Sequence, residues 1–275
     1  MERAPQACII CGTRKRELLI HKDPWYVRRC MHCGLGSLDP RPSQEEIKQL
    51  YRSDYFADHY DGGLDPDSPA FRKKLRAEGH RTRFIKAVKP SGRLLDIGCG
   101  YGYFLAACQQ QGYDVAGLDV SAWAAQYATQ KLGLPVSVGK FGDIKFPPHS
   151  FDIITMWHFL EHSPDPRLAL RTAKSWLRPD GILVIDVPDY EGTDAQRQWR
   201  DWDGWSLPYH LWHFTFKTLT LLLRKHGFKV IKRKNYHSDV VKQKLGRIPL
   251  LNLFARPIAK LYSGNSVAVI ARIEP

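Results

Sequence analysis

The stretch "LLDIGCGYGYFL", from Leu94 to Leu105, places glycines at positions 98, 100 and 102 behind two leucines, an aspartate and an isoleucine. An apolar strand that runs into a glycine-rich turn is typical of a sheet whose ligand binds beyond the carboxyl ends of its strands. A dinucleotide-binding turn has the pattern G-x-G-x-x-G, but here the third glycine comes one residue early and position 103 is tyrosine. The loop therefore departs from the pattern that holds a dinucleotide pyrophosphate.

Two aspartates stand at or near the carboxyl ends of predicted strands. Asp96 stands just before the glycines, and Asp119 closes the next apolar segment, "VAGLD". A carboxylate at the first position would repel a pyrophosphate and attract an ammonium or sulfonium group. A carboxylate at the second position can accept hydrogen bonds from ribose hydroxyls. The two acids together predict a nucleoside ligand with a positively charged tail.

From Gly92 onward, apolar strands alternate with segments of helical period. The predicted strands are "RLLDIG", "YDVAGLD", "LPVSVG", "FDIITMW" and "GILVIDVP", separated by helices that we expect to end at Gln111, Lys131 and Leu177. Such a β-α repeat predicts an α/β fold with a doubly wound, mostly parallel sheet.

Four cysteines near the N-terminus form two C-x-x-C pairs. Cys8 and Cys11 make the first pair and Cys30 and Cys33 the second, and each pair is followed directly by a glycine. This spacing is typical of a four-thiolate zinc ribbon, in which all coordination positions are filled and the metal is structural. A segment of about forty residues cannot fold on apolar burial alone, whereas a closed zinc site can stabilise it. The sequence therefore predicts a Zn²⁺ ion here, with a redox dithiol as the alternative.

The predicted organisation has three parts. We expect the zinc ribbon over residues 1–40, a helical connector over 41–90 and the main domain over 91–275, with a lid insert at 188–214 and a helical insert at 236–263. In the connector, the pattern of a capping box predicts one short helix from Ser43 through Tyr51. A serine followed by proline predicts a second, basic helix from Ser68 to about Lys89, whose cations either face solvent or bind an anion.

The charge balance favours anionic partners. The chain has 41 lysines and arginines against 28 acids, a formal net charge of +13. This favours RNA, nucleotide-linked substrates or an acidic membrane face, although a basic surface can also serve solubility alone. The start "MERAPQACII" shows no secretory leader and no apolar run is long enough to span a bilayer, so we expect a soluble, cytoplasmic protein.

The strings "LLDIGCGYGYFL", "GLDVS", "FGDI", "FDIITMWHFLEHSPDP" and "LRPDGILVIDVP" together resemble the successive motifs of class I S-adenosylmethionine-dependent methyltransferases. The resemblance covers about residues 92 to 188 and implies a Rossmann-like sheet that closes with an antiparallel strand, a place that suits "GNSVAVIARIE". It also implies S-adenosylmethionine as cofactor. The residues it assigns to the cofactor are Asp96, Gly98, Gly100 and Gly102 for the methionine end, Asp119 for the ribose, Asp143 with Ile144 for the adenine edge, and also Val120 and Trp157.

The lid insert is rich in tryptophan and histidine. A loop of this length in a compact domain is usually a lid or a binding loop, although its tryptophans could instead pack a small satellite core. Histidine has a pKa near neutrality, which suits removal of a proton from a methyl acceptor. His210 and His213 are therefore candidate catalytic residues.

The segment "YHLWHFT" resembles a stretch of sugar methyltransferases that carry an N-terminal zinc module. The resemblance implies that His210 acts as a general base. Tyr209 stands where those C-methylating enzymes have a glutamate, so O-methylation is at least as well favoured as C-methylation.

A second polar cluster, "HFLEH", contains His158, Glu161 and His162. It resembles the E-x-x-E-H segment of quinone-ring O-methyltransferases, in which acids and histidine bind a divalent ion, with His158 in place of the first glutamate. We count Glu161 and His162 as candidate catalytic residues. The alternatives are a structural cap by His162 on the loop before Pro164, and a protease pattern that lacks a third ligand.

The segment from Leu245 to Tyr262 mixes aliphatic and aromatic residues with three cations. It predicts either a helix that covers the sheet or a contact with an anionic membrane interface. The leading hypothesis for the whole chain is methylation of an anionic small-molecule acceptor, a sugar or lipid-linked glycan intermediate of the cell envelope. The alternatives are methylation of an RNA base, with the ribbon and basic helix binding RNA, and a non-catalytic binding module.

Overall fold

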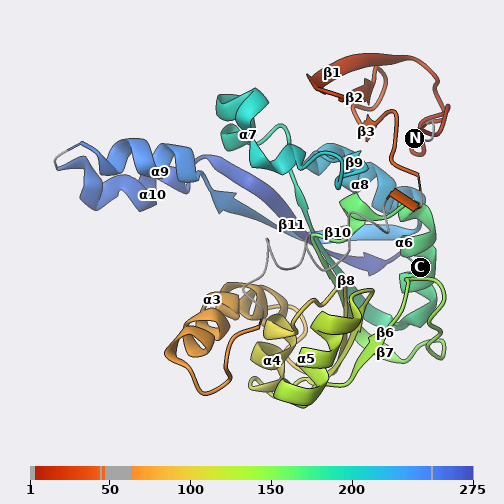
Figure 1. Ribbon diagram of the computed structural model, residues 1–275, viewed down its shortest axis with the longest axis vertical. Helices are drawn as coiled ribbons and strands as arrows, with labels where there is room; N and C mark the ends of the chain where they lie inside the picture. The colour runs from red at the N-terminus through yellow and green to blue at the C-terminus, as the bar shows by residue number, and fades with distance from the viewer. Residues whose placement is uncertain (1–3, 44, 47–62, 249, 275) are drawn as a thin grey trace. The chain divides into compact units, whose positions relative to one another are not determined.

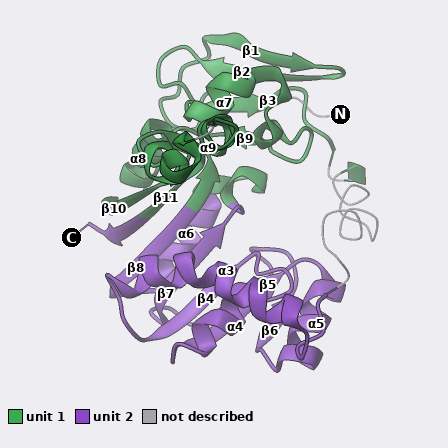
Figure 2. Cartoon of the chain, turned by 90° about the vertical axis from the view of Figure 1, so that its left-hand side faces the viewer, with its two compact units in different colours: residues 1–46, 160–167, 186–269 green, residues 47–159, 168–185, 270–275 purple. Residues whose placement is uncertain are grey.

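The computed structural model describes residues 4–43, 45–46, 63–248 and 250–274 (Figure 1). The chain divides into two compact units, each built from three segments (Figure 2). Unit 1 comprises Met1–Glu46, Leu160–Arg167 and Asp186–Val269, and unit 2 comprises Ile47–Phe159, Leu168–Ile185 and Ile270–Pro275. These units cut across the three consecutive parts expected from the sequence.

A seven-stranded sheet has the strand order β10-β11-β8-β7-β4-β5-β6. Its strands are β4 (Arg93–Ile97), β5 (Asp114–Asp119), β6 (Val136–Val138), β7 (Phe151–Trp157), β8 (Leu177–Pro188), β10 (Phe228–His237) and β11 (Ser263–Ile273). Strand β4 pairs in parallel with both β5 and β7, and β5 pairs in parallel with β6. The predicted fold class, a mostly parallel Rossmann-like sheet with antiparallel last strands, is confirmed.

Four helices lie along the part of the chain that forms the parallel strands. They are α3 (Pro69–Lys86), α4 (Tyr103–Gln109), α5 (Ala122–Leu132) and α6 (Pro166–Trp176), of which α6 starts in unit 1. Ser68 caps α3 by accepting a hydrogen bond from the amide of Phe71 at 3.0 Å, with proline in the first turn as predicted. Helices α3 and α4 end two to three residues before the expected Lys89 and Gln111, a difference common at fraying helix ends.

Burial explains why strands of the seven-stranded sheet, such as β7, have almost entirely apolar sequences. All seven residues of β7 are buried, as in strands covered on both faces of a parallel sheet. Gly102 precedes α4 at φ 75°, and a Cβ there would stand 2.7 Å from Cδ1 of Leu134. Only glycine allows both this backbone conformation and this close approach.

A second sheet, in unit 1, has the order β1-β2-β3-β9. It comprises β1 (Arg16–Lys22), β2 (Trp25–Cys30), β3 (Gly36–Leu38) and β9 (Trp212–His213), and all three neighbouring pairs are antiparallel. The last strand comes from the segment expected to form a lid. The ribbon and part of the insert are therefore one sheet, which the sequence did not predict.

The rest of unit 1 consists of short helices and one longer helix. The helices are η1 (Leu160–His162), α7 (Thr193–Gln198), η2 (Trp199–Asp201), η3 (Asp203–Trp205), α8 (Phe216–Lys225), α9 (Asp239–Gly246), η4 (Leu251–Phe254) and α10 (Ala255–Ala259). Ser43 and Glu46 exchange the hydrogen bonds of the predicted capping box, and residues 45–46 are helical. The rest of that predicted helix, to Tyr51, lies outside the described residues.

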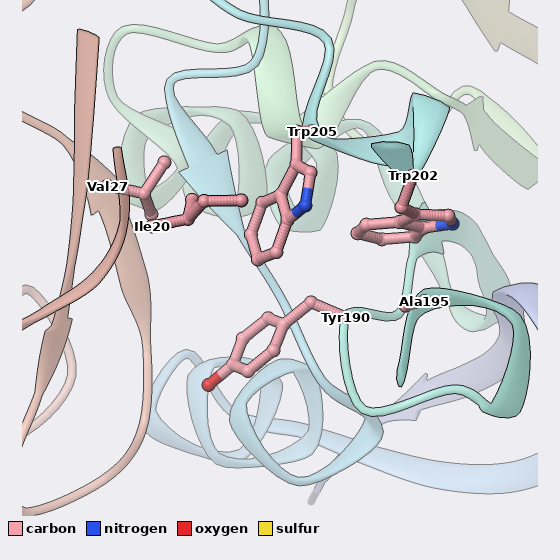
Figure 3. Close-up of a cluster of buried hydrophobic side chains, with 6 residues drawn as sticks. All are labelled: Ile20, Val27, Tyr190, Ala195, Trp202 and Trp205. Atoms are coloured by element: carbon pink, nitrogen blue, oxygen red, sulfur yellow. The ribbon is translucent and has the colours of Figure 1, made fainter. Parts of the chain in front are cut away.

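The tryptophans of the insert form a core instead of an open lid. Trp202 and Trp205 are 1% and 0% exposed, and they pack with Tyr190 and Ala195 (Figure 3). Ile20 and Val27, from β1 and β2 of the ribbon, belong to the same cluster. The satellite core that we weighed as the alternative is thus the observed arrangement, and it includes the ribbon.

In the part of the chain that the structure describes, no helix combines the length and the apolarity needed to cross a bilayer.

Candidate functional site

Asp96 lies in β4, next to its carboxyl end, and is 3% exposed. The hydroxyl of Thr155, on the neighbouring β7, donates a hydrogen bond to it at 2.6 Å. Burial raises the pKa of Asp96 to about 7, although the Thr155 hydrogen bond and the charge of Arg81 oppose this rise. A cation bound nearby would favour the ionised carboxylate and lower this pKa.

The glycine loop and Asp119 are joined by hydrogen bonds. The amide of Gly100 donates to one carboxylate oxygen of Asp119 at 2.7 Å, and the amide of Ser121 donates to the other at 2.8 Å. Burial is the main cause that raises the pKa of Asp119, while these amides act to lower it. Each carboxylate oxygen has a second lone pair, so Asp119 can still accept hydrogen bonds from a ligand.

The other predicted cofactor residues have varied surroundings within unit 2. Trp157 is 7% exposed, and its indole N–H has no hydrogen-bond partner among the described residues. Val120 is 55% exposed, and Asp143 is exposed in a turn with Ile144 beside it. Gly98 has φ 78° and its amide donates to Leu118 at 2.7 Å. The loop is therefore held by a backbone bond to Leu118 and by the carboxylate of Asp119.

An aromatic cluster beside the loop was missed by the sequence reasoning. Tyr101, between two of the glycines, is 2% exposed and makes edge contacts with Trp123 and Tyr127 at centroid distances of 5.6 and 5.2 Å. The amide of Leu64 donates to the hydroxyl of Tyr103 at 2.8 Å. The alternation of tyrosine with glycine at 101 and 103 was the available signal.

The four N-terminal cysteines converge as predicted. Their sulfur atoms all lie within 4.8 Å of one another, with Cys8 3.5 Å from Cys33 and Cys11 3.4 Å from Cys30. The glycines after the two pairs have φ values of 77° and 91°, and both amides donate back to the first cysteine of their pair at 2.9 Å. Contact with Cys33 lowers the pKa of Cys8 to about 4, while the same contact raises the pKa of Cys33. The set has the chemistry and compactness of a four-thiolate metal site.

A second group in unit 1 consists of Glu161, His162 and His210. One ligand atom from each lies within 4.8 Å of the other two, and the two imidazole rings meet edge to face at 4.6 Å. Nδ1 of His162 lies 3.0 Å from the carbonyl of Tyr209, and Nδ1 of His210 lies 2.9 Å from the carbonyl of Gly204. A carbonyl can only accept, so both Nδ1 atoms carry protons and each Nε2 is the basic nitrogen. This arrangement can take up a proton or coordinate a divalent ion.

His213 lies in a different environment. It is 4% exposed within β9, and burial, with a smaller contribution from the positive charge of Arg41, lowers its pKa to about 3. Arg41 itself is buried and stacks over the ring of Trp212 at 4.1 Å. The catalytic role expected for His213 stays a prediction. His158 is not part of the Glu161 cluster.

These groups belong to different units of the chain. Asp96, the glycine loop and Asp119 are in unit 2, whereas the thiols and the Glu161 cluster are in unit 1. The strand order and the two strand-end carboxylates define a Rossmann-like α/β protein of the kind that binds a nucleoside.

The chain belongs to the methyltransferase domain family, whose model matches residues 70–233. This confirms the predicted class of enzyme at the level of the family. Residues of both units fall within the match.

Curated relatives include the ubiquinone biosynthesis O-methyltransferase of Haemophilus ducreyi, which is 31% identical over 105 residues, 34% of this chain and 44% of that protein. The chain thus matches less than half of the length of that relative. An uncharacterized protein of Methanocaldococcus jannaschii is 27% identical over 180 residues, 65% of this chain and 82% of that protein. The expected similarity to sugar methyltransferases is not confirmed by these relatives.

Solved structures share the fold. A Thermotoga maritima SAM-dependent methyltransferase, described as a possible histamine N-methyltransferase, is 21% identical with a TM-score of 0.55 over 80% of this chain and 98% of that one. The Burkholderia thailandensis 1,6-didemethyltoxoflavin-N1-methyltransferase, solved with S-adenosylhomocysteine, is 21% identical with a TM-score of 0.53 over 94% of this chain and 100% of that one. At this identity the likeness shows the fold alone.

Proposed function

We propose that the chain transfers a methyl group from S-adenosylmethionine to a hydroxyl oxygen of a small-molecule acceptor. The observation that supports this most is the pair of buried carboxylates, Asp96 and Asp119, on the adjacent parallel strands β4 and β5, joined to the glycine loop. Burial raises the pKa of Asp96 to about 7, and a ligand cation beside it would stabilise the ionised carboxylate.

In this proposal different residues of the chain bind different parts of the cofactor. Asp96 and the glycine loop hold the charged methionine end, Asp119 accepts from the ribose hydroxyls, and Asp143 with Ile144 contacts the adenine. The buried indole N–H of Trp157, which has no protein partner among the described residues, is available to donate to a carboxylate or hydroxyl of a ligand. Val120 would contact the ribose or adenine through its exposed side chain.

We assign proton removal to His210. Methyl transfer from a sulfonium requires alignment of the acceptor and removal of its proton, since the electrophile is already activated. The bond of Nδ1 to Gly204 fixes the tautomer of His210, and Glu161 and His162 lie close enough to stabilise the imidazolium that forms. Where the same three residues hold a divalent ion instead, that ion would lower the pKa of a coordinated hydroxyl.

The acceptor we favour is a hydroxyl on a lipid-linked compound, a sugar as the sequence suggested or an aromatic ring. The curated relatives named for ubiquinone biosynthesis are O-methyltransferases, which supports oxygen as the acceptor atom and an aromatic ring as much as a sugar. We further propose that Cys8, Cys11, Cys30 and Cys33 bind a structural Zn²⁺ ion, because all four positions are thiols and leave no open site for catalysis.

The direct test follows a labelled methyl group. The full chain is incubated with methyl-labelled S-adenosylmethionine and with lipid, soluble and RNA fractions of a cell extract, and label is measured in each fraction. We expect transfer to the lipid fraction, and Asp96→Asn should abolish it by weakening cofactor binding. Asp114→Asn, an exposed aspartate at the other end of β5, is the matched control and should transfer normally. If no fraction is labelled although the S-adenosylmethionine is intact, the proposal is contradicted.

RNA methylation is the second candidate because the net charge of +13 suits a phosphate backbone. Label in the RNA fraction, together with binding that weakens steeply as salt rises, would favour it over the lipid-linked acceptor. A non-catalytic module is favoured only if calorimetry detects no binding of S-adenosylmethionine or S-adenosylhomocysteine.

A further inference from the structure

The insert between β10 and β11 exposes an unusual amount of apolar surface. Half of the large hydrophobic side chains that are exposed among the described residues lie between positions 248 and 262. Five of them are in the turn that connects α9 to α10. We call Ile248 and residues 250–254 the apolar tip; its exposed side chains are Ile248 (46%), Leu250 (83%), Leu251 (38%), Leu253 (76%) and Phe254 (58%).

The two helices beside the apolar tip are strongly basic. The segment from Ser238 to Tyr262 contains five cations, Lys242, Lys244, Arg247, Arg256 and Lys260, and a single acid, Asp239. All five cations are exposed. Asp239 lies 3.3 Å from Nε2 of His237, at the opposite end of α9 from the tip. The surface next to the apolar tip is therefore positive and has little acidic charge to neutralise it.

The base of this insert is fixed, although its tip is exposed. The buried carboxylate of Asp194 accepts hydrogen bonds from the hydroxyl of Ser238 and from the amide of Asp239, the latter at 2.9 Å, at the start of α9. The amide of Ser238 donates to the carbonyl of Ala259 at 3.1 Å, which joins the two ends of the insert. Val241, Ala255 and Ala259 are buried where α9 packs against α10. The exposed leucines are thus presented by a folded element.

The position of the insert excludes the alternative of a helix that covers the sheet. Helices α9 and α10 lie side by side beyond the ends of β10 and β11 (Figure 1). A covering helix would bury its apolar face against the sheet, whereas Leu250 and Leu253 remain largely accessible.

We propose that the apolar tip docks on an anionic lipid bilayer, with its leucines and Phe254 in the acyl boundary and the five cations against the headgroups. Apolar side chains flanked by exposed lysine and arginine are the composition of interfacial membrane anchors. A protein partner would have to match both the apolar patch and the surrounding positive charge, and a second copy of this chain would bring like charges together. The charge therefore favours an anionic bilayer over self-association.

The test measures sedimentation of the full chain with vesicles. We expect binding to vesicles of phosphatidylcholine with phosphatidylglycerol to be at least about tenfold stronger than to phosphatidylcholine alone, because each cation near an anionic surface strengthens partition by roughly fivefold. Raising the salt concentration should reduce this difference by screening. The double variant Leu250→Glu/Leu253→Glu should lose binding to both kinds of vesicle by about tenfold or more.

The matched control places the same two changes elsewhere. Leu18 and Leu168 are 54% and 43% exposed outside the insert, so Leu18→Glu/Leu168→Glu adds equal negative charge without touching the apolar tip. This control should bind vesicles nearly as well as the parent chain, and both double variants should keep its melting temperature, since the altered side chains are exposed.

Two results would overturn the proposal. Vesicle binding that is absent in the parent chain, or lost equally in both double variants, would show that the apolar tip is not a membrane anchor. A concentration-dependent dimer in light scattering that Leu250→Glu/Leu253→Glu dissociates, without vesicle binding, would show that the surface joins two copies of the chain. Neither result depends on methyl transfer, so the proposed activity is tested separately.

Discussion

At the residue scale, Asp96 gives the clearest test of cofactor binding, because its burial disfavours the ionised carboxylate. It is buried in β4 with one hydrogen bond from Thr155, and burial raises its pKa to about 7. An acid with a raised folded-state pKa contributes stability at low pH that is lost as the pH rises through about 7. A bound cation reverses this preference, since it stabilises the ionised carboxylate.

The affinity for S-adenosylmethionine should therefore depend on pH. Above about pH 7 Asp96 is ionised in the free chain, and binding needs no proton release from it. Below that pH the cofactor must displace a proton, so its affinity should fall by up to about tenfold per pH unit. Calorimetry in buffers of different ionisation enthalpy would measure both the affinity and the released proton.

The variant Asp96→Asn provides the control for this pH dependence. It should bind the cofactor weakly at every pH and release no proton near pH 7. A pH dependence that persists unchanged in this variant would assign the titration to another group, such as Asp119, whose pKa burial also raises.

His210 is the residue on which the proposed proton transfer depends. His210→Ala should lower turnover by about two to four orders of magnitude, the usual effect of removing a general base, while the dissociation constant of the cofactor stays nearly constant. His210→Asn separates chemistry from structure, because its amide N–H can still donate to the carbonyl of Gly204 but no basic nitrogen remains. Turnover restored by asparagine would mean that the histidine only holds the backbone in place.

At the scale of single elements, the ribbon is tied to the rest of unit 1 more closely than its sequence suggests. Strand β3 pairs with β9, with Gly36 opposite His213, and a Cβ at Gly36 would stand 2.8 Å from that of His213. Tyr190 donates its hydroxyl hydrogen to the carbonyl of Gly34, next to the second pair of cysteines. Disruption of the thiol site should therefore spread to the tryptophan core.

Metal removal tests this coupling. After a chelator is added, the fluorescence of buried Trp202 and Trp205 should shift to longer wavelength together with loss of the ribbon, because Ile20 and Val27 pack in the same core. A variant in which Cys99, which lies outside the ribbon, is replaced by alanine should respond to the chelator as the parent chain does. A ribbon that unfolds while the tryptophan emission stays constant would show that the two parts are stable independently.

The elements also show what sequence patterns can and cannot predict. Local signals were sufficient for α3, because Ser68 and Pro69 act within one helical turn, and for β7, because a strand buried on both faces is apolar throughout. The pairing of β3 with β9 could not be predicted, since each strand has only two or three residues and the partners are far apart in the chain. The convergence of the four cysteines was predictable because the spacing of the two C-x-x-C pairs can be recognised from the sequence alone.

At the scale of the whole molecule, the compact units do not follow the order of the chain. Each unit takes three separate segments, and β8 and β11 each contribute to both. The sequence gives no composition change at Leu160 or Asp186, where the chain passes between units, so no local signal marks these points. The proposed cofactor residues stand in short local motifs, whereas the core formed by Trp202 and Trp205 depends on contacts with the first thirty residues.

The pairing of β3 with β9 also has a consequence for synthesis of the chain on the ribosome. The cysteines emerge first, but the strand that completes their sheet follows only after Trp212 has been translated. At about 5 to 20 residues per second this delay is on the order of ten seconds or more, during which the nascent ribbon would present an open β3 edge. Early capture of Zn²⁺, or shielding of that edge by a chaperone, would then decide how much newly made protein escapes aggregation.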